Sequence, residues 1–155
     1  MLGKHAGASP REFESRLLRW LNMLLVKTYI SPSKIHGTGL FAAEDIKKGT
    51  VTWKFDSSID ILITKKQMSR LPRITQEFIK EYGSLSNLSH KYVLSADNAR
   101  FTNHSSKPNL ETKIIKGEPE AIAVANRDIE KDEELTINYR SFDQLSAKSQ
   151  QNYLK

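Results

Sequence analysis

Residues 100–109 read Arg100-Phe101-Thr102-Asn103-His104-Ser105-Ser106-Lys107-Pro108-Asn109, a dense polar run that ends in proline and asparagine. If this run is buried, its backbone donors and acceptors must find partners. Asparagine and histidine side chains can both donate and accept hydrogen bonds, which suits recognition of a polar heterocycle. A simple polar loop is the alternative interpretation. The run therefore marks a candidate binding site whose meaning depends on the segments around it.

Two further segments break the local pattern. In residues 34–41, Gly37 and Gly39 let the backbone take positive φ and approach a ligand closely, although a plain turn also explains them. No complete phosphate-binding or dinucleotide-binding fingerprint surrounds them. Residues 129–139 form an acidic turn that leads into a predicted strand ending at Tyr139. A lone tyrosine is most often a packing residue with a solvated hydroxyl.

Composition limits the class of protein. A chain of 155 residues, 38% hydrophobic and 27% charged, is expected to form one soluble globular domain. The absence of cysteine excludes a disulfide scaffold, a cysteine nucleophile and a thiolate metal site. The four histidines are scattered, so no metal is expected. No apolar run approaches the ~20 residues of a membrane span, and no secretory signal pattern is found. We therefore expect an intracellular protein.

The charge is uneven along the chain. The net charge is +6, yet residues 117–139 hold seven acidic and two basic residues and carry −5, which leaves +11 on the rest. A solvated basic surface, a basic face for nucleic acid or an acidic protein, and an acidic segment that attracts a basic peptide all remain open.

The pattern predicts an α+β fold built on small sheets with a few helices. Helices are expected over 10–24, where Ser9 to Glu12 form a capping box, over the patch 64–82 and over the tail 144–153. Thr64 and Gln67 form a second capping box. β-Branched and aromatic residues predict short strands at 26–30, 40–43, 51–55, 59–63, 92–94, 110–115, 121–126 and 134–139.

The order and separation of the three unusual segments resemble the SET domain, the protein lysine methyltransferase family. Its motifs are matched or approached by Gly37-Thr38-Gly39-Leu40-Phe41-Ala42, by residues 100–109 and by Glu134-Leu135-Thr136-Ile137-Asn138-Tyr139. The resemblance covers residues 26–142, with a helical insert at 64–83 and flanking segments at 1–25 and 143–155. It implies a β-clip-like fold with a threaded pseudoknot, a rare exception to unthreaded topology. Threading would bring residues 100–109 beside residues 134–139.

The resemblance implies a cofactor, S-adenosylmethionine, whose product is S-adenosylhomocysteine, and it implies no metal. Backbone from His36, Gly37, Thr38 and Gly39 would meet its methionine end. Asn103 and His104 would meet its amino group and adenine. Phe142, by its position after Tyr139, could cover the adenine.

The implied reaction transfers a methyl group to the side-chain amine of a protein lysine. Tyr139 is the expected catalytic residue, placed beside both the amine and the methyl donor. Tyr92 is either a second wall of the lysine channel or a core residue. Ile137 would also line the channel and, since it has no hydroxyl to hold a water, favours addition of more than one methyl group.

The sequence departs from the family pattern at two motif positions. Asn138 stands where the family usually has aspartate, and Ser106 replaces a frequent cysteine. Because the sequence has no cysteine, the family's zinc-binding flanking modules are not expected. The channel would then be closed by the tail 142–155, the N-terminal helix or a second subunit in a homodimer. A module that binds a lysine-bearing peptide without turnover is the alternative function.

The expected partner is a lysine-bearing protein, in particular a basic histone, histone-like or ribosomal protein. Nucleic acid would be involved only indirectly. The expected location is cytoplasmic, or nuclear in a eukaryote, with no membrane partner.

Overall fold

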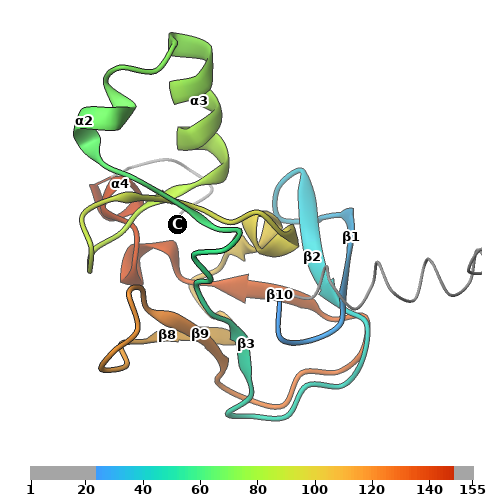
Figure 1. Ribbon diagram of the computed structural model, residues 1–155. Helices are drawn as coiled ribbons and strands as arrows, with labels where there is room; N and C mark the ends of the chain where they lie inside the picture. The colour runs from blue at the N-terminus through green and yellow to red at the C-terminus, as the bar shows by residue number, and fades with distance from the viewer. Residues whose placement is uncertain (1–23, 149–155) are drawn as a thin grey trace, which may run out of the picture.

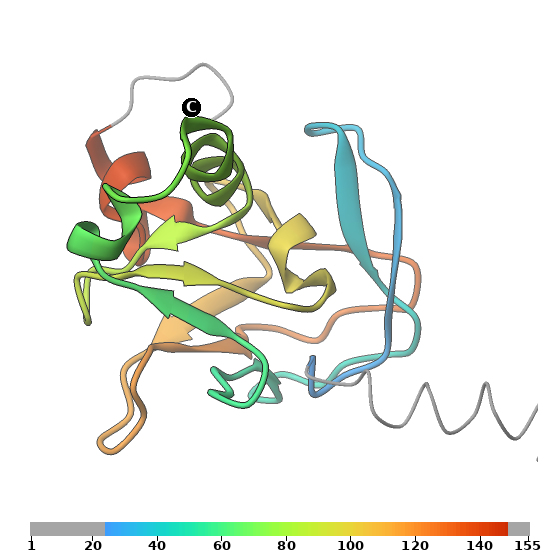
Figure 2. The same ribbon diagram turned by 45° about the horizontal axis from the view of Figure 1, so that its top comes forward.

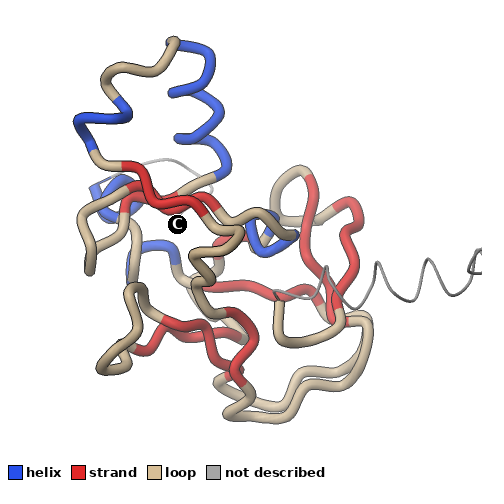
Figure 3. The backbone as a smooth tube through the Cα atoms, viewed as in Figure 1, coloured by secondary structure: helices blue, strands red, loops and turns tan. Residues whose placement is uncertain are grey.

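The computed structural model describes residues 24–148 and shows two small sheets with short helices at one end (Figure 1). The predicted helix 10–24 falls almost wholly outside these residues, as does the end of the tail 144–153. Strands are short and much of the chain between them is loop (Figure 3). Among residues 24–148, no helix has the length and apolarity that crossing a bilayer requires.

The larger sheet has seven strands, in the order β1-β2-β10-β8-β9-β3, with β7 also paired to β10. β10 is antiparallel to β2 and parallel to both β7 and β8. The strands are β1 (Thr28–Pro32), β2 (Thr38–Ala42), β3 (Val51–Trp53), β7 (Asn103–His104), β8 (Leu110–Lys113), β9 (Ile122–Ala125) and β10 (Glu134–Ile137). The β7–β10 pairing places residues 103–104 beside residues 136–137, the juxtaposition that the threaded topology predicts.

The smaller sheet and its helices form the insert. The sheet has the order β4-β6-β5, with β4 (Ile61–Ile63), β6 (Tyr92–Leu94) and β5 (Ser84–Leu85). Helices α2 (Lys65–Met68) and α3 (Arg73–Tyr82) lie over it (Figure 2). Met68 and Ile79 bury their side chains against Leu85 and Tyr92. The predicted capping box is confirmed, since Thr64 Oγ1 accepts from the Gln67 N–H and the Thr64 N–H donates to Gln67 Oε1.

The main core lies on the larger sheet. Leu40 and Leu135 are paired across β2 and β10 and are completely buried, and Ile129 is 1% exposed. Each such side chain stabilises the fold by about 1.5–3 kcal/mol through its removal from water. The core therefore fixes β10 against β2, and these two strands carry parts of the glycine motif and of the motif at residues 134–139.

Some predicted elements shift at their ends. β1 extends past the predicted strand 26–30 and ends at Pro32. Because β1 is an edge strand, the missing N–H of proline costs no ladder bond. Tyr139, expected in a strand, begins the 3-10 helix η2 (Tyr139–Ser141). Asn138 causes this change because its side-chain oxygen accepts from the Arg140 N–H and so favours a turn. The pattern did not predict β5, β7 or the 3-10 helix η1 (Asn98–Phe101). The tail forms α4 (Gln144–Lys148).

Asp97 gives the fold a pH dependence. Its carboxylate caps η1 by accepting from the Ala99 N–H at 2.8 Å. Burial, with a smaller contribution from the charge of Asp60, raises the pKa of the Asp97 carboxyl above its usual range. A group whose pKa is higher in the folded state binds more protons there, so the free energy of unfolding falls as pH rises through that pKa.

We therefore expect Asp97→Asn, which keeps an oxygen for the cap, to gain stability relative to the wild type at pH 7. The gain should disappear as the pH falls below the usual range for aspartate, since both chains are then neutral at this position. Urea unfolding of both chains between pH 3.5 and 7 measures the difference. A difference in stability that stays constant with pH would contradict the assignment.

Candidate active site

The loop between β1 and β2 forms one wall of the site. Gly37 has φ +47, which closes the turn, and the Ser33 N–H donates to the Gly37 carbonyl. Ser33 Oγ accepts from the Ile35 N–H and donates to the Glu134 carboxylate at 2.8 Å. The hairpin loop is thus tied to the first residue of β10, which lies 101 residues away in the chain.

Asn103 holds the loop against the polar run. Its side-chain Nδ2 donates to the His36 carbonyl at 3.1 Å, to the Thr38 carbonyl at 3.2 Å and to Glu134 Oε1 at 2.9 Å. Because these three bonds all come from Nδ2, the orientation of the amide is fixed and Oδ1 points away from them. Asn103 is 7% exposed, so the arrangement is largely shielded from water.

His104 and Thr102 position Tyr139. The Tyr139 N–H donates to His104 Nδ1 at 3.1 Å, and the two rings lie 5.5 Å apart. Since Nδ1 accepts this bond, the His104 ring carries its proton on Nε2. The Tyr139 hydroxyl donates to the Thr102 carbonyl at 2.5 Å. Both ends of the tyrosine are therefore held by the polar run.

The neighbouring acids Glu133, just before β10, and Glu134, its first residue, have different partners. Glu134 bonds Ser33 and Asn103, while Glu133 pairs with Arg127 and accepts from Asn109 Nδ2. The Arg127 guanidinium is the main reason that the pKa of the Glu133 carboxyl lies below its usual range. Glu134 thus belongs to the site and Glu133 to the outer surface of the sheet.

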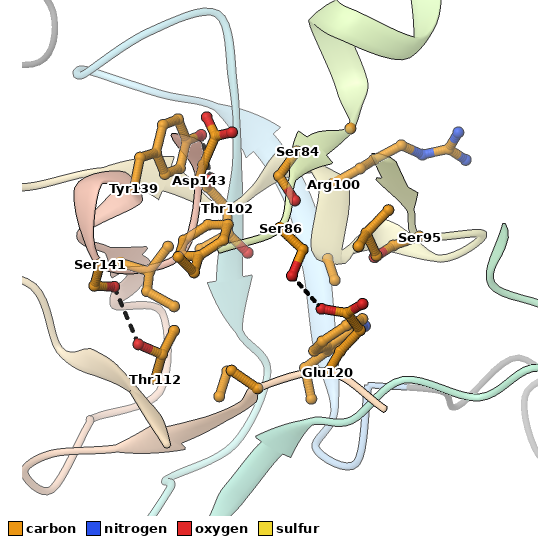
Figure 4. Close-up of a pocket in the computed structure, with 18 of the residues that line it drawn as sticks. Ser84, Ser86, Ser95, Arg100, Thr102, Thr112, Glu120, Tyr139, Ser141 and Asp143 are labelled. Carbon is orange, nitrogen blue, oxygen red and sulfur yellow. Dashed lines mark hydrogen bonds between the residues drawn. The ribbon is translucent and has the colours of Figure 1, made fainter. Parts of the chain in front are cut away.

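Two cavities meet at Tyr139. The smaller, of about 100 Å³, is lined by Ile35, His36, Asn103, His104 and Tyr139, together with residues of α3. The larger, of about 630 Å³, lies between the two sheets and is lined by residues that include Thr102, Ile137, Tyr139 and Phe142 (Figure 4). Lys80, Glu81 and Tyr139 border both cavities.

The structure brings most of the predicted site residues together. His36, Asn103, His104 and Tyr139 share the small cavity, and the backbone of residues 36–39 runs along it. Ile137 and Phe142 line the large cavity, and the Phe142 ring packs edge-on against Tyr139 at 6.0 Å.

Tyr92 lies elsewhere. It is 9% exposed, packs with Met68, Ile79 and Leu85, and lines neither cavity. Its position supports the core interpretation and gives no support to a role in a lysine channel.

Three residues that the sequence analysis did not single out complete the site: Ser33, Thr102 and Glu134. Glu134 could have been found, because it begins the third motif and is the first residue of the predicted strand 134–139. Thr102 acts through its backbone carbonyl, which no residue type reveals.

The comparison with known protein families agrees with this geometry. The SET domain profile matches residues 37–140, which include the β2 glycine, the polar run and Tyr139. The chain belongs to the SET-domain family. Among the described residues of this SET domain, no three histidine, aspartate or glutamate side chains are placed to hold a metal ion.

Similar proteins include histone-lysine N-methyltransferase 2D of Homo sapiens, 30% identical over 118 residues that make up 72% of this chain. A Schizosaccharomyces pombe relative, a histone-lysine N-methyltransferase specific for H3 lysine-4, is 31% identical over 135 residues and 82% of this chain. The SET domain spans only 2% and 14% of the lengths of these two relatives.

A solved structure from Plasmodium falciparum, described as a candidate histone methyltransferase, is also similar. It matches with a TM-score of 0.52 and 26% identity over 72% of this chain and 91% of its own. The SET fold of this chain, with its mixed small sheets, is therefore shared with nearly all of that solved chain.

Proposed function

We propose that this SET domain transfers a methyl group from S-adenosylmethionine to the side-chain amine of a lysine in a protein substrate. The observation that carries the proposal is the place of Tyr139, whose side chain borders both the small cavity and the large one. A methyl transfer needs donor and acceptor to meet at one point, and the wall between two cavities provides such a point.

The small cavity fits the methionine end of the cofactor. An ammonium group needs oxygen acceptors, and the fixed Asn103 amide presents Oδ1 because Nδ2 is occupied by the loop carbonyls and Glu134. The cavity, of about 100 Å³, is smaller than the roughly 300–1,000 Å³ of typical ligand sites. It therefore accounts for part of the cofactor, and the exposed side of the loop at Ile35 and His36 is where the remainder would bind.

When bound, S-adenosylmethionine supplies an electrophilic methyl group on a sulfonium. The acceptor amine must be neutral, and a free lysine with pKa ~10.4 needs about 4.6 kcal/mol to lose its proton at pH 7. Ile137, Leu110 and Phe142 line the large cavity with apolar surface, which lowers the pKa of a lysine placed there. The Tyr139 hydroxyl donates its proton to Thr102, so its oxygen is oriented to accept from the amine.

Asn138, which departs from the family pattern, is compatible with this function. Its side-chain oxygen accepts from the Arg140 N–H and starts η2, a bond that an amide makes as well as a carboxylate. We infer that the substitution keeps the turn that positions Tyr139. The alternative, a module that binds lysine without turnover, then has less support from this residue than the sequence alone gave it.

The substrate we propose is a basic protein such as a histone, histone-like or ribosomal protein, which places the activity in the cytoplasm or, in a eukaryote, the nucleus. The catalytic unit would comprise residues 26–142, with the insert beside the substrate, since residues 80–83 line the large cavity. Three earlier expectations stay predictions: that Phe142 covers the adenine of the cofactor, that more than one methyl group is added, and that the protein forms a homodimer. Quantitative mass spectrometry and sedimentation test the last two.

The function is tested by incubating the purified chain with methyl-labelled S-adenosylmethionine and a set of purified basic proteins. We expect label in protein that is stable to acid and is recovered as methyl-lysine after hydrolysis. Binding of S-adenosylhomocysteine without any transfer of label would favour the binding module. If the chain neither binds S-adenosylhomocysteine nor transfers label to any protein, the proposal is wrong.

Gly39 provides a test of the cofactor site. A Cβ at this position would overlap Glu134 Oε1 and lie 3.0 Å from Ser33 Cβ. Because the glutamate end is flexible, Gly39→Ala should displace it at a cost of about 1–2 kcal/mol in unfolding free energy. The Asn103 amide then loses its acceptor, and we expect S-adenosylhomocysteine to bind at least about tenfold more weakly by calorimetry.

Gly117→Ala is the matched control. Gly117 lies in the hairpin between β8 and β9 with φ +95 and open space around its Cα, so alanine strains the backbone without touching the site. Its stability should fall while its affinity for S-adenosylhomocysteine stays that of the wild type. Equal affinity in both variants would show that Glu134 does not organise the cofactor site.

A further inference from the structure

Glu120 is a buried acid on the wall of the large cavity. It precedes β9 and is 4% exposed. Its Oε2 accepts from Ser86 Oγ at 2.5 Å, a bond drawn in Figure 4, while Oε1 has no hydrogen-bond partner within residues 24–148. Glu120 also takes part in none of the ion pairs formed in that part of the chain. The fold thus buries an acceptor that it does not use.

Ser86 holds this carboxylate in a fixed orientation. The Leu88 and Ser89 N–H groups donate to Ser86 Oγ at 3.0 and 3.1 Å, so the lone pairs of the hydroxyl are occupied by the turn. Its one proton is therefore committed to Glu120 Oε2. The result is a preorganised acid, with Oε1 left for a group from outside the described chain.

The cost of this arrangement points to a cationic ligand. A carboxylate removed from water without a counter-charge is destabilising, and a hydrogen-bonded cation relieves that cost. Trp53, which lines the same cavity, has a buried Nε1–H that likewise has no partner within residues 24–148. A peptide would satisfy both groups, with a cationic side chain for Glu120 and a carbonyl oxygen for the indole.

We propose that Glu120 binds the side chain of a lysine or arginine that flanks the methylated lysine in the substrate. This rests on the proposed function, because it places the reacting lysine at Tyr139 and the flanking cation at Glu120 in one cavity. Figure 4 shows these two residues on different sides of that cavity, with Ser86 beside Glu120. The site would select basic substrates through one buried carboxylate rather than through overall charge.

The test uses synthetic peptides with a central lysine on a neutral background, in which one flanking position at a time is arginine, lysine or glutamine. Binding is measured by fluorescence polarisation with S-adenosylhomocysteine present, and methyl transfer is measured separately. We expect one flanking position at which arginine or lysine binds at least about tenfold more tightly than glutamine, as a charge-assisted hydrogen bond provides. In Glu120→Gln, which is nearly isosteric, that ratio should fall to about one.

Glu118→Gln is the control, since Glu118 pairs with Lys54 and does not line the cavity, and its variant should keep the wild-type ratio. Thermal unfolding by circular dichroism shows that each variant is folded before its ratio is interpreted. A preference that depends on Glu120 supports the subsite even if no peptide is methylated, in which case the proposed function alone fails. No flanking preference in the wild type, or one that persists in Glu120→Gln, overturns the subsite.

Discussion

Tyr139→Phe should reduce the rate of methyl transfer at least about 100-fold while S-adenosylhomocysteine still binds. The phenylalanine ring keeps the contacts with His104 and Phe142, but the hydroxyl that bonds the Thr102 carbonyl is lost. Without that oxygen, the acceptor amine has no fixed partner at the boundary of the two cavities, and a small misplacement of a reacting group costs about this factor. Single-turnover assays with labelled cofactor measure the rate, and calorimetry measures binding of the product.

Tyr29→Phe is the matched control. The Tyr29 hydroxyl also makes one hydrogen bond, to Asp132 at 2.9 Å, but the residue lies on β1, is exposed and lines neither cavity. Its variant should transfer methyl groups at the wild-type rate. If Tyr139→Phe did the same, the mechanism proposed for the tyrosine would be wrong, whatever the substrate.

Asn109→Ala should lower the free energy of unfolding by about 3 kcal/mol. Asn109 is 2% exposed; its Oδ1 accepts from the Thr136 N–H at 2.8 Å and its Nδ2 donates to the Glu134 carbonyl at 2.8 Å. Alanine would leave two buried backbone groups of β10 without partners, each at about 1–3 kcal/mol. Urea unfolding and the melting temperature report the change.

Asn126→Ala provides the comparison, because Asn126 is half-buried and its side chain makes one bond, to the Pro108 carbonyl. We expect a loss of about 1 kcal/mol there. Equal losses of stability in the two variants would show that the hydrogen bonds of Asn109 to the backbone of β10 stabilise the fold no more than the single bond of Asn126.

The sequence was informative about the site because the three unusual segments are themselves local patterns. Asn103, His104 and Tyr139 were identified because their segments resemble the SET family, and the structure places them around one cavity. The polar run, however, contains asparagines with two different structural roles, which the residue type alone does not distinguish. Asn103 bonds the loop at His36, whereas Asn109 bonds the backbone of β10.

The features that were missed depend on contacts between distant parts of the chain. β7 has two residues and forms only because β10 lies alongside it, so no propensity marks it. Tyr92 sits in a β-branched and aromatic stretch that suits a channel or a core equally well, and its packing with Met68, Ile79 and Leu85 is visible only in the folded chain. Glu120 was counted only as part of a charged segment, because burial of a single acid is a property of the folded chain.

The sheet order also bears on how the chain folds as it is made. β10 is the last of the described strands in sequence, yet it lies inside the larger sheet and joins β2 on one side to β7 and β8 on the other. Until residues 134–137 leave the ribosome, the two parts of that sheet have no strand between them, and Leu40 has no Leu135 to cover it. Chains usually fold from the N-terminus during synthesis, but this order postpones the decisive step to the end. A nascent chain stopped before β10 would expose the edge of β2 to neighbours, which makes interrupted translation a route to aggregation.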